Sequence, residues 1–520
     1  MRGVEVVLAL VILATVVAVT AKRLRAPAPS LLVLAGLLVG SLTWVPDVRV
    51  EPEIVSLVVL PPLLYTAGEE LSWRALKAVW KPVSLLAVGL VIASAAVVGL
   101  VAAALTSLPW SMAFLLGTVL ASTDPVAVTA LGRRLALPAR VQTLVQAESL
   151  FNDATSLLLF RIAVVVVVSA QGLSPGHVAG EFVLLAGGGV LAGALVAAGI
   201  AVIRRRTEDP VLETVIALIT PYAAYVLAEV AHASGVTAVI VTAVIIGNQA
   251  PALTTANIRL QLAAVYGTVV FLLESVVFAL IGLQLPTLIR GLADDRQPWL
   301  VPAVVVAVTL IAVRVAWVFP LAALQQWRRG ARPSWQVPAV VSWAGARGVV
   351  PLAAALSIPL TTTAGTALPH RELVVVLATA VIAISLTIQG FTLAPLVRAA
   401  GISVDPSDLD EEYALARLRI AEAAMNRLQE LEDLEAAPGT VVERLRVVLL
   451  DRIERGELRA RGDGDVDDIS RAYVATRRDL IAAEVAELHR LHERGEIGER
   501  TVRNVQRVLD LEESSLDRAH

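Results

Sequence analysis

The stretch Leu144–Phe160, LVQAESLFNDATSLLLF, is the part of the sequence that decides what kind of fold to expect. It places Glu148, Asn152 and Asp153 inside an apolar run long enough to cross a bilayer, where ionisable side chains are costly to bury and mark functional sites. At helical spacing Ser149 and Asp153 share one face, and Glu148 and Asn152 share the adjacent one. The pattern indicates a site for a small cation or a proton. The alternative is a polar cluster that only joins helices.

The composition of the whole chain is that of a membrane protein. Of its 520 residues 57% are hydrophobic, and the mean hydropathy of +0.73 exceeds that of soluble globular proteins. The absence of cysteine excludes disulfides, thiolate catalysis and Cys-based metal sites, and six histidines argue against a histidine-rich metal centre. Apolar segments of about 20 residues predict an all-α polytopic membrane protein with about thirteen transmembrane helices, near residues 4–20, 29–45, 52–69, 82–106, 109–131, 140–169, 180–203, 210–232, 235–250, 262–289, 299–325, 335–358 and 372–398.

Basic residues are distributed unevenly over the loops between these spans. The connections after odd-numbered spans hold most of them, for example in the clusters Lys22–Arg25 and Arg204–Arg206. The positive-inside rule then predicts a multi-pass protein of the plasma (inner) membrane with its N-terminus outside and its C-terminus in the cytoplasm, which requires an odd number of spans. The first apolar run could also be a signal peptide, but its basic residues follow the run, which favours a first span.

Two spans are interrupted near their middle. Residues 121–125, ASTDP, lie in the fifth span, where the proline lacks an N–H group and clashes with the carbonyl four residues earlier. Residues 343–351, WAGARGVVP, repeat this feature in the twelfth span with two glycines. Seven spans separate the two, so we expect inverted repeats, spans 1–6 against spans 8–13, whose broken helices cross near the bilayer midplane. Asp124 would face half-helix N-termini and Arg347 half-helix C-termini. Two ordinary proline kinks are the simpler alternative.

Further charged residues fall within the spans. We expect Arg161, Glu274 and Arg314 to form structural ion pairs, with direct ion binding as the alternative for each. Arg347 is expected to serve Glu148 and unwound carbonyls together. Glu69, Glu70 and Glu213 lie near span ends and are expected to be hydrated. One carboxylate is left over when the deep acids Asp124, Glu148, Asp153 and Glu274 are set against the deep bases Arg161, Arg314 and Arg347. That balance suits a site that always needs a proton or a monovalent cation.

The composition changes after residue 400. Residues 401–520 are rich in Arg and Glu, carry more acids than bases, and show apolar residues at helical spacing. We therefore divide the chain into a transmembrane domain, 1–400, and a cytoplasmic helical tail, 401–520. Asp463, Asp465 and Asp467 are spaced as in a calcium loop, but Asp468 replaces the turn glycine and Val474 the bidentate glutamate, so we interpret this stretch as a solvated turn.

Three motifs in order resemble those of the monovalent cation:proton antiporters, in the NhaP/NHE-like sodium/proton exchanger branch. They are STDPVAV at 122–128, ESLFNDATSL at 148–157 and GARGVVPLAAAL at 345–356, with LPPLLY at 60–65 in support. The resemblance covers the membrane part, to about residue 400. It implies a transporter rather than an enzyme, with no cofactor, with Na⁺ (or K⁺ or Li⁺) and H⁺ as substrates, and with no nucleic-acid partner. It also implies a homodimer in the lipid membrane, with a moving core domain beside a dimerisation domain.

The resemblance also implies roles for individual residues. The aspartate of the family's Asn-Asp pair binds the ion, a role that falls to Asp153, with Asp124 as the second carboxylate of the monovalent cation site. The further implied ligands are the Thr123 carbonyl and Ser149, and the supporting polar network is Glu148, Asn152 and Arg347. After LPPLLY many relatives have an acid where this chain has Thr66, which leaves the cation preference open.

The function expected from the sequence is secondary antiport for pH homeostasis: one monovalent cation, most simply Na⁺, exchanged for one H⁺ by alternating access at Asp153. A K⁺/H⁺ exchanger of the same fold is the first alternative, and a channel or sensor gated by the tail is the second. An intramembrane aspartyl protease is weaker still, because its Gly-x-Gly-Asp motif occurs here only at Gly462–Asp465, in the polar tail.

Overall fold

The computed structural model describes residues 2–24, 26–42, 55–124, 137–169, 175–207, 209–292, 298–328, 330, 332–362, 365–403, 406–434, 437–460 and 465–517. Within these ranges the regular structure is helical, apart from one isolated bridge between Thr361 and Ala367. The prediction of an all-α fold is therefore confirmed. The chain divides into two compact units, Met1–Ser403 and Val404–His520.

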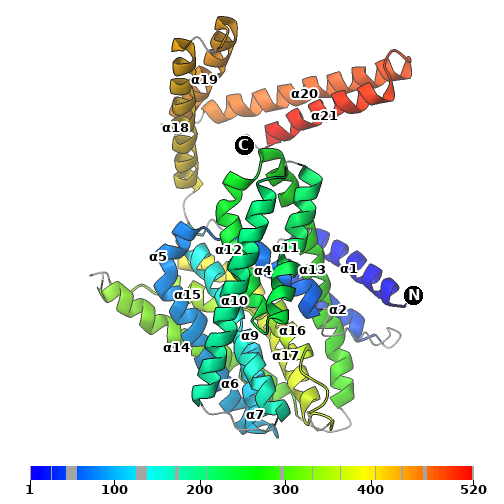
Figure 1. Ribbon diagram of the computed structural model, residues 1–520, viewed down its shortest axis with the longest axis vertical. Coiled ribbons are helices and arrows are strands. Elements are labelled where there is room, and N and C mark those ends of the chain that lie inside the picture. Colours follow the sequence, from blue (N-terminus) through cyan, green and yellow to red (C-terminus); the bar gives the residue numbers. More distant parts are fainter. Residues whose placement is uncertain are drawn as a thin grey trace. The chain divides into compact units, whose positions relative to one another are not determined.

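The first unit is a bundle of helices (Figure 1). Its elements are α1 (Arg2–Leu24), α2 (Ala28–Gly40), the π-helical turn η1 (Val55–Val59), α4 (Leu60–Glu69), α5 (Trp73–Ser84), the π-helical turn η2 (Leu85–Leu90), α6 (Val91–Leu105), α7 (Trp110–Ala121), α9 (Ala139–Ser169), α10 (Pro175–Arg204), α11 (Pro210–Val230), α12 (Gly235–Leu253), α13 (Ala256–Leu292), α14 (Leu300–Arg328), α15 (Gln336–Trp343), α16 (Val349–Leu356) and α17 (Arg371–Ala400). Among the described residues seven helical segments are long and apolar enough to cross a membrane, and shorter apolar helices accompany them. The number of thirteen spans remains a prediction.

The breaks in the helices bring two distant stretches of chain together. α15 ends at Trp343 and α16 begins at Val349, with non-helical residues between them, so the predicted interruption of the twelfth span is present. α7 ends at Ala121, and residues 122–124 are also non-helical. The Asp124 N–H group donates a hydrogen bond of 2.7 Å to the Ala346 carbonyl, so the two non-helical stretches cross. Pro125, which was expected to cause the first break, lies outside the described residues.

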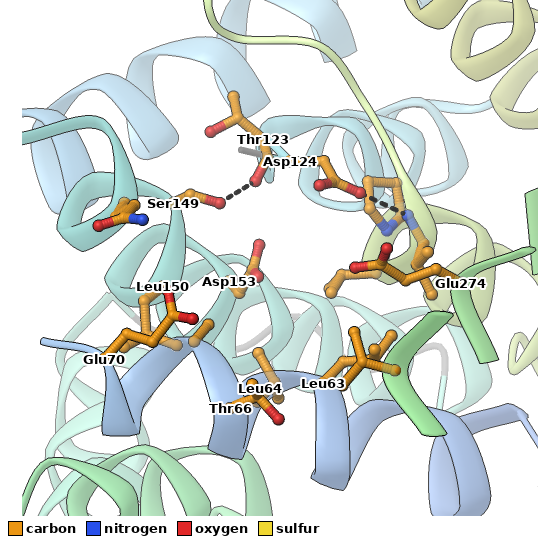
Figure 2. A pocket seen from close by; sticks show the side chains of 16 residues that line it. Leu63, Leu64, Thr66, Glu70, Thr123, Asp124, Ser149, Leu150, Asp153 and Glu274 are labelled. Carbon is orange, nitrogen blue, oxygen red and sulfur yellow. Dashed lines mark hydrogen bonds between the residues drawn. The ribbon is translucent and has the colours of Figure 1, made fainter. Parts of the chain in front are cut away.

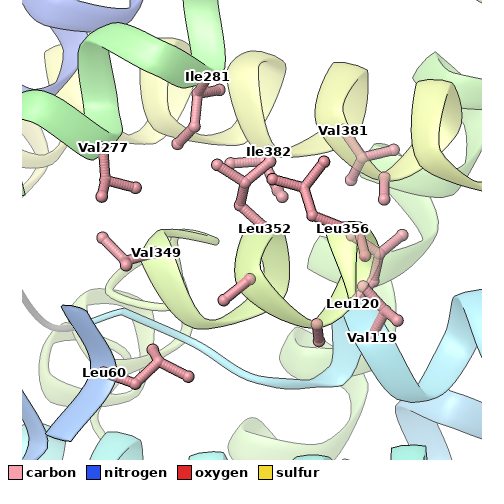
Figure 3. Close-up of a cluster of buried hydrophobic side chains, with 14 of the residues drawn as sticks. Leu60, Val119, Leu120, Val277, Ile281, Val349, Leu352, Leu356, Val381 and Ile382 are labelled. Atoms are coloured by element: carbon pink, nitrogen blue, oxygen red, sulfur yellow. The ribbon is translucent and has the colours of Figure 1, made fainter. Parts of the chain in front are cut away.

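The short helix α16 is held by apolar side chains from several neighbours. Figure 3 shows its Val349, Leu352 and Leu356 among side chains of other helices. These are Leu60 of α4, Val119 and Leu120 of α7, Val277 and Ile281 of α13, and Val381 and Ile382 of α17, all of them buried. In a lipid environment such close packing, rather than removal of apolar surface from water, holds helices together. The position of the break before α16 is therefore fixed from several sides.

The second unit consists of helical hairpins. Its helices are α18 (Pro406–Asp433), α19 (Gly439–Ala460), α20 (Asp465–Glu493) and α21 (Glu499–Asp517). α20 packs on α21 through a buried apolar cluster made of Val474, Ile481, Leu488, Leu509 and Leu516. Asp463 lies outside the described residues, and α20 already begins at Asp465, within the stretch expected to be a turn.

Candidate ion-binding site

The non-helical stretch after α7 is held in place by side chains of α9. The Ser149 hydroxyl donates to the Thr123 carbonyl at 2.5 Å, and the Asn152 amide donates to the Thr123 hydroxyl at 2.5 Å. The Thr123 N–H group in turn donates to Asn152 Oδ1 at 3.3 Å. Spacings of three and four residues place these α9 side chains on one face. The backbone N–H and carbonyl of Thr123, which lie beyond the end of α7, are thus satisfied within the protein, as non-helical backbone at membrane depth requires.

Asp153 lies on the same face of α9 and is 6% exposed. Within the described part of the chain its carboxylate has one hydrogen bond, donated by the Ser122 hydroxyl. Ser122 was not among the ligands predicted from the sequence, although its place directly before Thr123 in the interrupted stretch was a signal for it. The carboxylate is therefore oriented by a neutral group and has no basic hydrogen-bond partner among the described residues.

A cavity of about 430 Å³ opens beside Asp153. Figure 2 shows the Asp153 carboxylate facing this space, with Thr123 and Ser149 on one side and α4 on the other. Its polar lining residues are Thr66, Glu70, Thr123, Asp124, Gln146, Ser149, Asp153 and Glu274. All four ligands implied by the resemblance thus border one cavity, which is large enough to hold several waters beside an ion.

Asp124 links the two broken elements. Its side chain accepts a hydrogen bond of 3.2 Å from the N–H group of Val349, the first residue of α16. A carboxylate at this position is stabilised by the partial positive charge of the helix N-terminus. Gly348 is required here, because a Cβ at that position would overlap the Asp124 carboxylate. The structure therefore places Asp124 opposite a half-helix N-terminus, where the sequence pattern had put it.

Glu148 does not form the ion pair with Arg347 that the sequence suggested. Its two carboxylate oxygens accept from Arg314 at 2.5 and 2.6 Å, and the same guanidinium donates to the Val341 carbonyl in the last turn of α15 at 3.2 and 3.0 Å. Gly345 makes room, since a Cβ there would lie 2.6 Å from Arg314 Nε. Arg314 of α14 thus fills the role expected of Arg347, and it ties α9, α14 and α15 together.

Arg347 is buried in the non-helical stretch between α15 and α16. Its Nη1 donates to the Gly345 carbonyl at 2.9 Å, just beyond the end of α15, and its backbone N–H donates to the Ser385 hydroxyl at 3.1 Å. Within the described residues its Nε has no hydrogen-bond partner. The guanidinium is close enough to Glu148 and Asp153 to interact with both electrostatically. It therefore supplies a fixed positive charge near the candidate ion ligand.

The remaining charged residues divide into paired and unpaired groups. Arg161 of α9 pairs with Glu229 of α11, a partner that the sequence reasoning missed. Glu213, expected to be hydrated, is instead fully buried and accepts from Arg204 at 2.7 Å. For Glu274 of α13 no hydrogen bond or ion pair is found within the described ranges, so the expected structural pair is missing there. Glu274 lines the cavity instead.

Comparisons with known proteins agree with this fold. A family model described as "Sodium/hydrogen exchanger, transmembrane" matches residues 8–399. An uncharacterised Na⁺/H⁺ exchanger of Mycobacterium tuberculosis is 37% identical over 449 residues, which cover 84% of this chain and 82% of the relative. The Na⁺/H⁺ antiporter ApNhaP of Aphanothece halophytica is 30% identical, with 87% and 84% covered.

A solved structure shows the same fold. The sodium proton antiporter MjNhaP1 from Methanocaldococcus jannaschii superimposes with a TM-score of 0.64 at 20% sequence identity, over 77% of this chain and 98% of that one. The family match spans nearly the whole membrane unit, and the relatives are transporters rather than enzymes. The chain therefore belongs to the sodium/hydrogen exchanger family of multi-pass membrane antiporters.

Proposed function

We propose that this protein exchanges Na⁺ for H⁺, one for one, by alternating occupancy of Asp153. The observation that carries the proposal is a buried carboxylate that faces a cavity and receives a hydrogen bond from one neutral hydroxyl, that of Ser122. A carboxylate at membrane depth without a paired base needs a bound cation or a proton. Each occupant therefore displaces the other, which is the chemical basis of antiport.

The ligands around Asp153 are oxygens. The Thr123 carbonyl accepts one hydrogen bond from Ser149, and a carbonyl has a second lone pair with which to bind a cation. Asp124 and the Ser149 hydroxyl border the same cavity. Asn152 fixes Thr123, while Glu148 and Arg347 complete the supporting network. Na⁺ is the proposed cation because ApNhaP, one of the similar proteins, is a Na⁺/H⁺ antiporter; K⁺/H⁺ exchange at the same site is the alternative.

The proposal includes an orientation and an assembly. The basic loops support an external N-terminus and a cytoplasmic tail, 401–520, in the plasma membrane. All the interrupted helices and membrane-depth charges precede the tail, so ion translocation is assigned to residues 1–400 and regulation to the tail. The working unit is a homodimer, as the family resemblance implies.

Transport by the purified protein in proteoliposomes tests the function directly. Vesicles loaded with acid are diluted into Na⁺, K⁺ or Li⁺, and proton efflux is followed with a pH-sensitive dye. We expect saturable efflux with Na⁺. Efflux with K⁺ alone would identify the alternative exchanger, whereas single-channel currents without pH coupling would identify a channel.

Acid should inhibit exchange by competition. Because H⁺ and Na⁺ share Asp153, mass action predicts that the apparent KM for Na⁺ rises about tenfold per pH unit once protons occupy most sites. The maximal rate at saturating Na⁺ should stay constant. The measurement is the initial rate against Na⁺ concentration at several pH values. A maximal rate that falls with acid at constant KM would contradict competition at one site.

Exchange should be electroneutral. Asp153 has the neutral Asn152 as its neighbour, Glu148 is held by Arg314, and Asp124 is held by the N-terminus of α16, so one carboxylate changes its occupant in each cycle. Moving a net charge against 100 mV costs about 2.3 kcal/mol, so an electrogenic cycle would respond strongly to voltage. Clamping the membrane potential with K⁺ and valinomycin should therefore leave the initial rate of Na⁺ exchange unchanged. A transport current that follows the Na⁺ gradient would show that a second carboxylate cycles.

A further inference from the structure

Glu274 is a charged residue at membrane depth that ion pairing does not explain. Apart from Asp153, the buried acids outside the crossing that the structure pairs each face an arginine: Glu148 faces Arg314 and Glu213 faces Arg204. The partly exposed Glu229 faces Arg161. Glu274 has no such partner within the described residues, and it lines the cavity. Ionisable residues in membrane spans either pair with one another or line an ion pathway. Glu274 therefore fits the second alternative, a residue that lines an ion pathway.

The position of Glu274 sets it apart from the site on α9. The cavity is closed opposite Asp153 by six residues that we call the α4–α13 wall: Leu63, Leu64, Thr66, Ala67, Val270 and Glu274. Glu274 is the acid that α13 contributes to the cavity lining, and Glu70, directly after α4, is another acid on this side. Figure 2 shows the Glu274 carboxylate on the side of the cavity near Asp124. Glu274 and Asp124 are close enough to interact electrostatically. Thr66 carries no charge, and its hydroxyl donates a hydrogen bond of 2.8 Å to the Pro62 carbonyl of its own helix.

We propose that Glu274 supplies a further carboxylate of the cation pathway, beyond Asp153 and Asp124, which attracts the cation into the cavity before Asp153 binds it. A cavity lined by carboxylates and closed by low-dielectric walls raises the local concentration of cations. Glu274 is more exposed than Asp153, so water in the cavity stabilises its charge. It therefore shapes the affinity for the cation without exchanging a proton for it, and the one-for-one stoichiometry is retained. This inference rests on the proposed function.

The test measures Na⁺ affinity in proteoliposomes containing full-length protein. Glu274→Gln should raise the apparent KM for Na⁺ about tenfold, equivalent to about 1.4 kcal/mol, and leave the maximal rate at saturating Na⁺ within about twofold. Glu181→Gln on α10, the same substitution outside the cavity lining, is the matched control and should leave KM unchanged. If Glu274→Gln folds poorly, the variants Glu274→Asp and Glu274→Asn test the same point. Their side chains have equal size, and only the aspartate carries a charge, so their KM values for Na⁺ can be compared directly.

A carboxylate introduced at position 66, which lines the same cavity, provides a second test. Thr66→Asp places an acid on the same wall, so it should lower the KM of the Glu274→Gln variant more than it lowers that of the wild type. A merely structural role for Glu274 predicts instead a lower melting temperature, an unchanged KM and no rescue by Thr66→Asp. That result, or equal KM values for Glu274→Asp and Glu274→Asn, would overturn the inference. The wild type and Asp153→Asn are measured in parallel, because absence of exchange by the wild type would refute the proposed function itself.

Discussion

Cation-dependent proton movement should fall to the background of empty liposomes when Asp153 is replaced by asparagine. The amide keeps the shape of the side chain and its contact with Ser122, but it neither binds and releases a proton nor supplies a negative charge. The substitution also removes a carboxylate that has no basic hydrogen-bond partner within the described residues, so the melting temperature should stay equal or rise. Proton efflux and thermal unfolding of the same purified sample are the two measurements.

A nearby neutral substitution provides the control. The Ser156 hydroxyl, one turn along α9, donates to the Thr118 carbonyl at 2.6 Å and does not line the cavity. Ser156→Ala removes a hydrogen bond worth about 1 kcal/mol and should leave exchange within a few-fold of the wild type. Substantial exchange by well-folded Asp153→Asn protein would falsify the assignment of the ion site.

Replacing Arg314 by alanine should destabilise the protein by about 3–5 kcal/mol, because it leaves the Glu148 carboxylate buried and unpaired. The effect should be larger than that of most substitutions, since the guanidinium also satisfies the Val341 carbonyl at the end of α15. The double variant Arg314→Ala with Glu148→Gln should regain part of this stability. Thermal unfolding in detergent, together with the yield of monodisperse protein, measures the effect.

The Arg161–Glu229 pair offers a comparison within the same chain. Its side chains are 34% and 33% exposed, against 3% and 1% for Arg314 and Glu148. Solvent weakens a partly exposed pair, so Arg161→Ala should cost less than about 1 kcal/mol. Two results would contradict this account. One is an equal loss of stability in Arg314→Ala and Arg161→Ala, and the other is a strictly additive loss for Arg314→Ala and Glu148→Gln. Either would show that burial and pairing do not determine how much each arginine stabilises the protein.

Much of the site could be predicted from sequence because its signals are local. Ser149, Asn152 and Asp153 follow one another at helical spacing, and helical spacing alone puts them on one face. The crossing of the two broken elements required one further step, the inverted relation of the fifth and twelfth spans. Residues 122–124 and 344–348 then had to be neighbours, and Asp124 had to lie near the start of α16.

The pairs between distant helices could not be predicted. Glu148 and Arg314 are separated by 166 residues, and nothing local distinguishes Arg314 from Arg347 as the partner of Glu148. Periodicity tells which face of a helix is polar, but the partner depends on how two helices are rotated and shifted against each other. The same limit explains the missed pairing of Arg161 with Glu229 and the unexpected place of Glu274 in the cavity.

The α4–α13 wall has a mechanical consequence. On the α9 side of the cavity, hydrogen bonds join Thr123, Glu148, Asp124 and Arg347 to several helices, and even a neutral bond of this kind costs about 1 kcal/mol to break. Across the cavity, the wall makes no side-chain hydrogen bond to that side within the described residues, and five of its six members are apolar or bonded to their own helix. Shear motions follow boundaries of this kind, where packed surfaces slide without exchanging directional bonds. We therefore propose that, during alternating access, the ion-carrying helices shift along this boundary past α4 and α13, against which α16 packs through apolar side chains.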